Sequence, residues 1–272
     1  MKRFIAPAAA CACLFLCACG VGNTEGETTA ETTAAPEDLL YTAAEGPETA
    51  PEADGPIEYE YTHVEYGETG FFCCPRLLGE GKSAINGAIE KAVTDQLSAL
   101  DAPGYAICEV MYSGAGLFSV KSCAMMIADE DMSSSAVPAP RTECVDSVLP
   151  ITFDAVSGEQ LTLADLFDPE NERWRGLIPD IVTLQAEKQE MTLLSDVMPA
   201  ADDRPFYLTE DALVILYRPY EIATYSAGWP EFAIPLDQLS GLFAPEGPVA
   251  SMLTEKAAAE ETHKERNTEK ES

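Results

Sequence analysis

The sequence FYLTEDALVILYRPYEIATYSAGWPEFAIPLDQL, residues 206–239, carries the signals of a β-hairpin followed by one more strand. Apolar and polar residues alternate from Phe206 to Tyr217, and the alternation is interrupted at Glu210-Asp211, where a hairpin would turn. A shorter run, residues 232–236, predicts a last strand. We therefore expect antiparallel pairing at this end of the domain.

Between the hairpin and the last strand lies an aromatic segment, YRPYEIATYSAGWPEF, residues 217–232, which one glycine and two prolines interrupt. The candidate ligand-binding residues in it are Tyr220, Glu221, Tyr225 and Trp229. Aromatic rings in a loop can stack on sugar faces or contact a protein. The alternative is that they pack the corner between the hairpin and the last strand. An ionised Glu221 needs a partner in either case, and Arg218 is the expected one.

The upstream sequence predicts further strands and two principal helices. The expected strands are 58–66, 144–154, and a hairpin of 105–112 with 117–128. Residues 82–100 place apolar side chains at four-residue spacing, as an amphipathic helix does. Asp168 followed by Pro169 predicts the start of a second helix, with a carboxylate N-cap and proline at the first helical position. Because helices and strands are segregated along the chain, the expected class is α+β with a mainly antiparallel sheet.

The first eighteen residues resemble a bacterial lipoprotein signal peptide. Lys2-Arg3 precede the apolar run Phe4–Leu16, which is too short to span a membrane as a mature helix. The run ends in LCACG, which resembles a lipobox and implies acylation at Cys19. A plain secretory peptide cut near Ala18, or a short buried helix, is the alternative. Residues 19–57 contain nine carboxylates and no Lys or Arg, which predicts an acidic disordered tether.

The folded part is expected to span two halves, 58–165 and 166–246, before a disordered charged tail at 247–272. Residues 58–246 contain 32 Asp and Glu against 10 Lys and Arg, an excess of 22 negative charges. Such a field argues against nucleic acid as a partner and favours cationic ones, although solubility alone is the alternative explanation. We expect a monomer, held at the membrane by its N-terminal lipid.

Residues that support common hydrolytic chemistry are scarce. His63 is the one histidine in 58–246, which argues against zinc hydrolases and Ser-His-Asp hydrolases. Counting does not exclude glycosidase chemistry by paired carboxylates. Asp129-Glu130-Asp131 lacks the spacing of a calcium-binding EF-hand loop, and neither a GxGxxG nor a Walker A motif occurs. We expect no catalytic residue, no metal and no cofactor.

Five cysteines accompany Cys19 in the expected mature chain: Cys73, Cys74, Cys108, Cys123 and Cys144. A bridge between Cys108 and Cys123 would join the two strands of the predicted hairpin, since disulfides form outside the cytoplasm. Five small buried residues is the alternative.

Residues 206–239 also resemble the C-terminal half of the extracytoplasmic domain shared by RsiV-type anti-sigma factors and PdaC-type peptidoglycan deacetylases. The shared features are a Phe-Tyr-Leu hairpin, Pro-Tyr-Glu-Ile-Ala, Tyr-x-Ala-Gly, Pro-Glu-Phe and Ile-Pro. TFDAVSGEQLTLADLF, 152–167, is similar to an upstream segment of that domain, and the likeness covers about 60–240. Two positions depart from the pattern. Residues 133–144 have no Gly-Gly-Ala-His-type segment, and Ala212 stands at a turn where relatives often carry glycine, so this turn must avoid a positive φ or accept strain.

The resemblance implies a function in binding or sensing. RsiV-type domains sense lysozyme through a chain with a spanning helix, and PdaC-type enzymes append a catalytic domain. This sequence shows neither feature, so we expect a non-enzymatic, lipid-anchored module at the cell surface. Its expected ligand is a lysozyme-type cationic protein or a cell-wall glycan such as peptidoglycan. The alternative is a cell-wall hydrolase that uses paired carboxylates. Because relatives with different attached functions share the aromatic segment, the resemblance favours a packing role for its rings.

Overall fold

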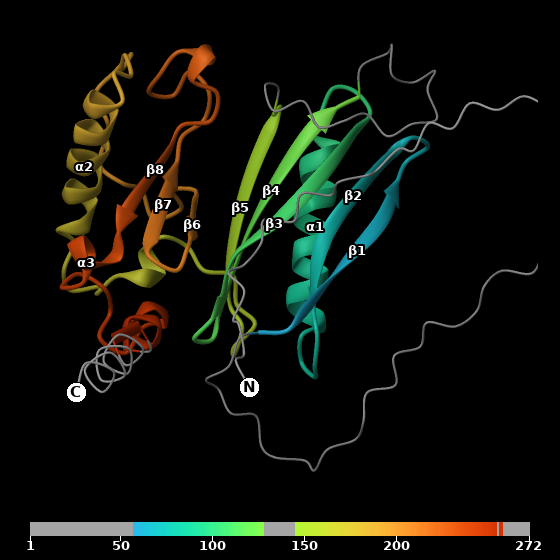
Figure 1. Cartoon of the computed structure of the whole chain (residues 1–272), viewed down its shortest axis with the longest axis horizontal. Coiled ribbons are helices and arrows are strands. Elements are labelled where there is room, and N and C mark those ends of the chain that lie inside the picture. The colour runs from blue at the N-terminus through green and yellow to red at the C-terminus, as the bar shows by residue number, and fades with distance from the viewer. Residues whose placement is uncertain (1–56, 128–144, 255, 258–272) are drawn as a thin grey trace, which may run out of the picture. The chain divides into compact units, whose positions relative to one another are not determined.

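The computed structural model describes residues 57–127, 145–254 and 256–257, which all belong to one compact unit, Thr49–Ser272 (Figure 1). The architecture is α+β, as predicted, and consists of a five-stranded sheet and a three-stranded antiparallel sheet with their helices. Cys19, the predicted signal peptide 1–18, the predicted tether up to residue 56, and residues 128–144 lie outside the described residues.

The five-stranded sheet has the order β1-β2-β3-β4-β5. Its strands are β1 (Tyr59–Tyr66), β2 (Gly70–Leu77), β3 (Gly104–Gly114), β4 (Leu117–Met126) and β5 (Ser147–Asp154). Neighbouring strands are antiparallel except β2 and β3, which run parallel because α1 (Ser83–Ser98) connects them. The sequence alone did not reveal β2. The sheet is therefore mainly antiparallel, as expected, with β1 and β5 at its edges.

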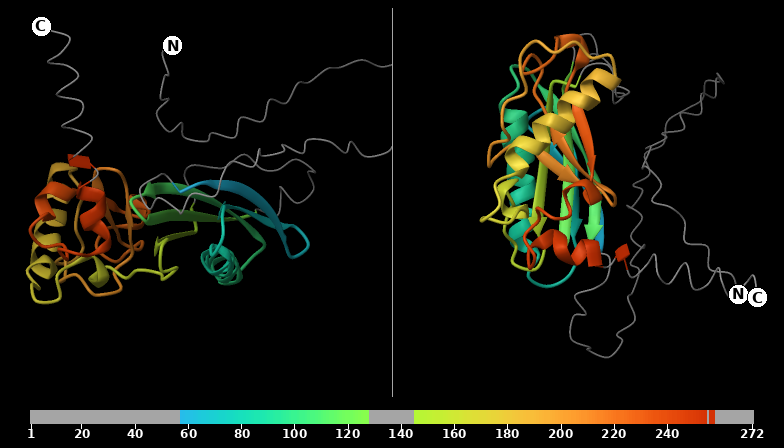
Figure 2. Two further views of the ribbon diagram at one scale, coloured as in Figure 1. Left: turned by 90° about the horizontal axis from the view of Figure 1, so that it is seen from below. Right: turned by 90° about the vertical axis from the view of Figure 1, so that its left-hand side faces the viewer.

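Helix α1 packs on one face of this sheet (Figure 2). The apolar stripe that predicted it is fully or almost fully buried: Ile85, Ile89, Val93 and Leu97. These side chains meet Phe118 and Val120 of β4, which alternate with residues that point to the opposite face. The expected helix 82–100 is thus confirmed, with its ends one or two residues inside the predicted ones.

The second sheet has the order β6-β7-β8, with β6 (Phe206–Leu208), β7 (Ala212–Leu216) and β8 (Glu231–Pro235). Helix α2 (Trp174–Lys188) packs on it, and the short helix α3 (Leu236–Leu239) follows β8. The predicted hairpin and last strand are confirmed. Thr209 N–H donates to the Ala212 carbonyl at 2.9 Å, and Ala212 is not among the described residues with positive φ. The turn therefore avoids the strain that alanine would otherwise suffer.

Two expected boundaries are wrong. Asp168 does not cap α2: its carboxylate accepts from the Glu170 N–H at 2.9 Å, and its carbonyl accepts from the Asn171 N–H at 3.0 Å. These bonds close a separate turn, and α2 begins only at Trp174.

The charged tail was expected to begin at residue 247, but residues 248–254 are helical. Val249 and Met252 in that helix are buried in the core of the smaller sheet, which holds it in place.

The two sheets meet where β6 lies beside β4 and β5. Ser119 in β4 and Thr152 in β5 join their hydroxyls at 2.7 Å, and Leu208 N–H of β6 donates to Ser119 Oγ at 3.0 Å. All three residues are almost completely buried. Because a buried polar group without a partner is costly, this bond network fixes the smaller sheet at one position on the larger one.

Candidate functional site

The aromatic segment 217–232 divides into a packed part and an exposed part. Tyr217 and Phe232 are buried and meet edge to face, with ring centroids 5.8 Å apart. Burial raises the pKa of Tyr217. Tyr220 and Tyr225 are about two-thirds exposed and stack on each other at 5.6 Å. The corner is therefore packed by Tyr217 and Phe232, whereas Tyr220 and Tyr225 lie at the surface.

Trp229 lies between these extremes. Its side chain is half-buried against the cluster of Tyr207 and Leu216, and its indole N–H donates to the Val145 carbonyl at 3.3 Å. One part of the ring remains open. A tryptophan held at one end and open at the other is a common contact for a ligand.

The ionic partner of Glu221 is Arg204 and not Arg218, as the sequence had suggested. Arg204 Nη1 pairs with Glu221 Oε1, and the Arg204 guanidinium stacks 4.5 Å from the centroid of the Tyr217 ring. Arg218 contributes backbone groups alone: its N–H donates to Glu221 Oε2 at 2.9 Å, and its carbonyl accepts from Glu221 N–H at 3.1 Å. Glu221 thus holds the loop in place, and both of its carboxylate oxygens already have partners.

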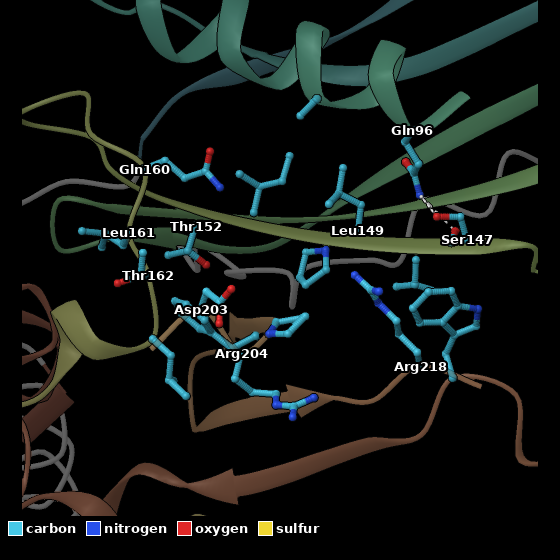
Figure 3. A pocket seen from close by; sticks show the side chains of 18 of the residues that line it. Gln96, Ser147, Leu149, Thr152, Gln160, Leu161, Thr162, Asp203, Arg204 and Arg218 are labelled. Carbon is cyan, nitrogen blue, oxygen red and sulfur yellow. Dashed lines mark hydrogen bonds between the residues drawn. The ribbon is translucent and has the colours of Figure 1, made fainter. Parts of the chain in front are cut away.

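A pocket of about 560 Å³ lies beside β5 (Figure 3). Its lining comes from the C-terminal part of α1, from Ser147–Thr152 of β5, from residues 160–163, from Asp203–Phe206, and from the aromatic loop. The loop contributes Arg218 and Trp229. Of the four candidate ligand-binding residues, only Trp229 lines this pocket. Tyr220, Glu221 and Tyr225 lie outside it.

Two arginines, Arg204 and Arg218, line the pocket together with two aspartates, Asp95 and Asp203. The Arg204 side chain is only 15% exposed, and its Nε is a buried donor without a hydrogen-bond partner among the described residues. The Arg218 side chain is exposed and extends toward β5, and no described carboxylate pairs with it (Figure 3). Because Arg204 pairs with Glu221 and its Nε is shielded from solvent, the exposed Arg218 is the arginine that can reach a carboxylate or another anion in the pocket. Sequence reasoning missed both as site residues, although arginine is rare enough in 58–246 to mark them.

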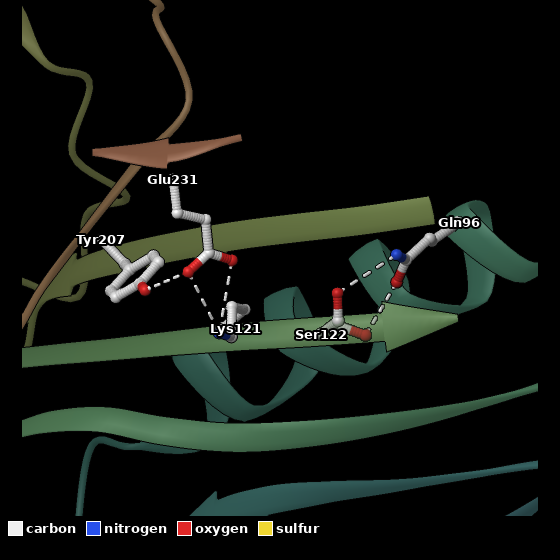
Figure 4. A network of polar contacts seen from close by, with 5 residues as sticks. All are labelled: Gln96, Lys121, Ser122, Tyr207 and Glu231. Atoms are coloured by element: carbon white, nitrogen blue, oxygen red, sulfur yellow. Dashed lines mark hydrogen bonds and ion pairs between the residues drawn. The ribbon is translucent and has the colours of Figure 1, made fainter. Parts of the chain in front are cut away.

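Near the pocket, Glu231 accepts from the Tyr207 hydroxyl at 2.7 Å and faces Lys121 Nζ at 3.4 Å (Figure 4). Burial, and then the bond to Glu231, raise the pKa of Tyr207. Gln96 and Ser122 form a second network on the other side of β4, where Ser122 Oγ donates to Gln96 Oε1 at 2.7 Å. These groups are satisfied by one another, and they fix the strands that carry the pocket.

The bridge between Cys108 and Cys123 that the sequence left open is absent, and both cysteines are free. Cys108 lies opposite Ser122 and Cys123 lies opposite Ile107, so the two side chains point to opposite faces of the sheet. No disulfide joins the four described cysteines, and Cys144 lies outside the described residues. Burial raises the pKa of Cys108 to about 12, which keeps this thiol protonated and unreactive.

His63 stacks on Phe71 with ring centroids 4.9 Å apart, and Asp129-Glu130-Asp131 lie outside the described residues. In the described part of the chain, no group of three or more His, Cys, Asp or Glu side chains is placed to hold a metal ion. Nor is any helix there long and apolar enough to cross a membrane.

Part of the chain matches a known family of protein domains. A family model described as "Protein of unknown function (DUF3298)" matches residues 164–237, so a DUF3298 domain is found there. No curated protein matches the chain. Among solved structures, the chain is similar to a DUF3298 family protein from Pseudomonas aeruginosa PAO1, at 19% identity and a TM-score of 0.47, over 71% of this chain and 97% of that one. It is also similar to a DUF3298 family member from Bacteroides fragilis NCTC 9343, at 12% identity and a TM-score of 0.46, over 73% and 98%. The matched residues include Arg204, Arg218 and Trp229.

Proposed function

We propose that this protein is a non-enzymatic binding module of the cell envelope, whose pocket beside β5 takes up a carboxylate-bearing fragment of the cell-wall glycan. One observation carries the proposal: a half-open tryptophan and two arginines line the same pocket of about 560 Å³. Trp229 offers an apolar face to a sugar ring, and Arg218 offers a bidentate donor to a carboxylate. Wall glycans combine these two chemical groups, because their amino sugars carry short peptides with free carboxylates.

Trp229→Ala is expected to weaken binding of soluble muropeptides by about tenfold or more, because a ring that stacks on the ligand would be lost. Because Trp229 is only half-buried, the variant should lose less stability than the 3–5 kcal/mol typical of a fully buried aromatic residue. Calorimetric titration with purified muropeptides gives the affinity, and thermal unfolding gives the stability.

Tyr225→Ala is the matched control, since Tyr225 belongs to the same loop but lies outside the pocket. It should bind muropeptides like the unmodified protein. Equal affinities for all three proteins would show that the pocket does not take up the ligand.

Two carboxylates line the pocket, Asp95 and Asp203. Asp95 is engaged by Lys91 on the exposed side of α1, which leaves it poorly suited to act as a catalytic acid. This supports a binding role over a hydrolase with paired carboxylates. Turnover of muropeptides by the purified protein, lost in Asp95→Asn or Asp203→Asn, would reverse this assignment.

A second candidate ligand is a lysozyme-type cationic protein, favoured by the exposed stack of Tyr220 and Tyr225 on a domain with 22 excess negative charges. We expect lysozyme to bind more weakly at 1 M than at 0.1 M salt, because the Debye length falls from about 10 to about 3 Å. A specific contact through the rings should retain part of its affinity at high salt.

Tyr220→Gly should remove the affinity for lysozyme that is retained at high salt. It should not destabilise the fold, since Tyr220 has a φ of 66°. Binding equal to that of a matched basic control protein, and abolished by salt, would reduce the contact to charge alone.

The proposal places the module outside the cytoplasm, tethered through a lipid on Cys19. A Cys19→Ala variant should then leave the membrane fraction or remain an uncleaved precursor. Identical partitioning of both proteins into the soluble fraction would contradict the lipobox interpretation.

A further inference from the structure

Strand β5 is an edge strand whose second side faces the pocket. Among the named strands it pairs with β4 alone, an isolated bridge joins its Phe153 to Gln160, and six consecutive residues, Ser147–Thr152, line the pocket. Because Leu161 N–H occupies the Thr152 carbonyl, the open part is residues 147–151, about 13 Å long at about 3.3 Å per residue. It is long enough to accompany about four residues of an extended chain.

The hydrogen-bond pattern shows which backbone groups of β5 point away from β4. The Thr152 carbonyl accepts from Leu161 N–H at 2.8 Å, and Asp154 N–H donates to the Glu159 carbonyl at 2.9 Å. Even-numbered residues therefore direct their backbone groups outward, and the period of two extends this to Val148 and Pro150. Residues 159–161 occupy the outward groups at one end of β5. No described residue makes a hydrogen bond to the outward N–H and C=O of Val148 or to the outward C=O of Pro150.

Proline at position 150 agrees with this orientation. It lies opposite Lys121 in β4, and a proline in a sheet must direct its missing N–H away from the partner strand. It also removes one donor from the middle of the open edge. A long strand of another protein would lose a bond there, whereas a short peptide can use the donor and two acceptors that remain.

Arg218 supplies a charged anchor beside the same edge. Its side chain extends toward β5, and no described carboxylate pairs with it (Figure 3). A guanidinium with free donors prefers a carboxylate, which it can bind through two parallel hydrogen bonds. The edge and Arg218 together match a chain that carries amide groups and an acid.

We propose that the open edge of β5 and Arg218 form a subsite for a short extended peptide with a free carboxylate, namely the peptide stem of a wall fragment. This inference rests on the proposed function and adds to it that the peptide, and not only the sugar, is recognised. Val148 and Pro150 bind the amide groups of the stem, and Arg218 binds its carboxylate.

The test uses three probes on the folded protein: a synthetic stem tetrapeptide, the same peptide with its carboxylates amidated, and a tetrasaccharide of N-acetylglucosamine. The free-acid peptide should bind, and amidation should weaken it by about tenfold to a hundredfold. Arg218→Gln should cause a similar loss, and amidation should cost little more in that variant, because both changes remove one interaction. Arg76→Gln, an exposed arginine on β2 outside the pocket, is the control and should change nothing.

Amide hydrogen exchange measured by NMR tests the edge itself. The peptide should slow exchange at Val148 N–H by about tenfold or more, because this donor would gain a partner. Leu149 N–H already points to β4, so its exchange should not respond. The peptide subsite is wrong if the tetrasaccharide binds but the peptide does not. It is also wrong if the peptide leaves the exchange rate of Val148 N–H unchanged. In both cases the proposed function stands. If neither the probes nor muropeptides bind, both proposals fail.

Discussion

Trp174→Ala is expected to lower the free energy of unfolding by about 3–5 kcal/mol, as large-to-small changes at buried aromatic positions do. Trp174 is 2% exposed and begins α2. Its ring stacks on Phe167 at 4.6 Å, and Phe167 stacks on Phe243 at 5.2 Å. Truncation would therefore open a cavity at the end of a row of three rings that ties α2 to the C-terminal segment. Urea denaturation followed by circular dichroism gives the free energy.

Trp174→Phe serves as the control for this experiment, because it keeps an aromatic ring in the row and should cost about half as much or less. Exposed Tyr225→Ala should cost almost nothing. A loss below about 1 kcal/mol in Trp174→Ala would mean that this row of rings does not hold α2.

Arg204→Ala is expected to cost about 2–3 kcal/mol, the largest effect among the charged residues. The variant removes a guanidinium that is packed on Tyr217 and paired with Glu221, and it leaves that carboxylate without its ionic partner. The estimate lies below the range for fully buried pairs because the Glu221 side chain is 32% exposed. Since Arg204 also lines the pocket, the variant should weaken muropeptide binding as well.

Arg175 provides the matched comparison, because it also stacks on an aromatic ring, that of Trp174, and also pairs with an acid, Asp202. Its side chain is 30% exposed against 15% for Arg204, and Asp202 is 65% exposed. Arg175→Ala should therefore lower the free energy of unfolding clearly less than Arg204→Ala does. Equal losses in the two variants, measured by the same denaturation, would show that burial does not set the strength of these pairs.

The sequence predicted the helices and strands in which apolar residues recur with the same spacing as the buried positions. The four-residue spacing of Ile85, Ile89, Val93 and Leu97 predicted α1, because these side chains face one core. Alternation around Glu210-Asp211 predicted the hairpin of β6 and β7 for the same reason. The sequence GFFCCPRL of β2 has no such alternation, since both faces of this strand are partly covered. It was therefore missed.

The candidate site was predicted less well than the fold, because it is assembled from segments far apart in the chain. Local sequence suggested Arg218 as the partner of Glu221, but Arg204, which precedes β6, takes that position. This exchange leaves Arg218 available to the pocket, and no pattern within 217–232 could indicate it. Trp229 was identified because an aromatic residue in a loop is conspicuous in any sequence. The exposure of Tyr220 and Tyr225 depends on how the loop turns, which composition does not specify.

Strand β4 has a consequence for how the domain folds. Leu117 and Phe118 are neighbours in the chain and are both fully buried, but they belong to the cores of different sheets. Each core is therefore completed by a residue of the same strand, and the segment matched by the family model lacks β4. Residues 164–237 alone would expose the apolar surface that Leu117 covers, and loss of either core would release β4 from the other. The two sheets should consequently fold and unfold in one cooperative transition, so that neither half of the chain is an autonomous folding unit.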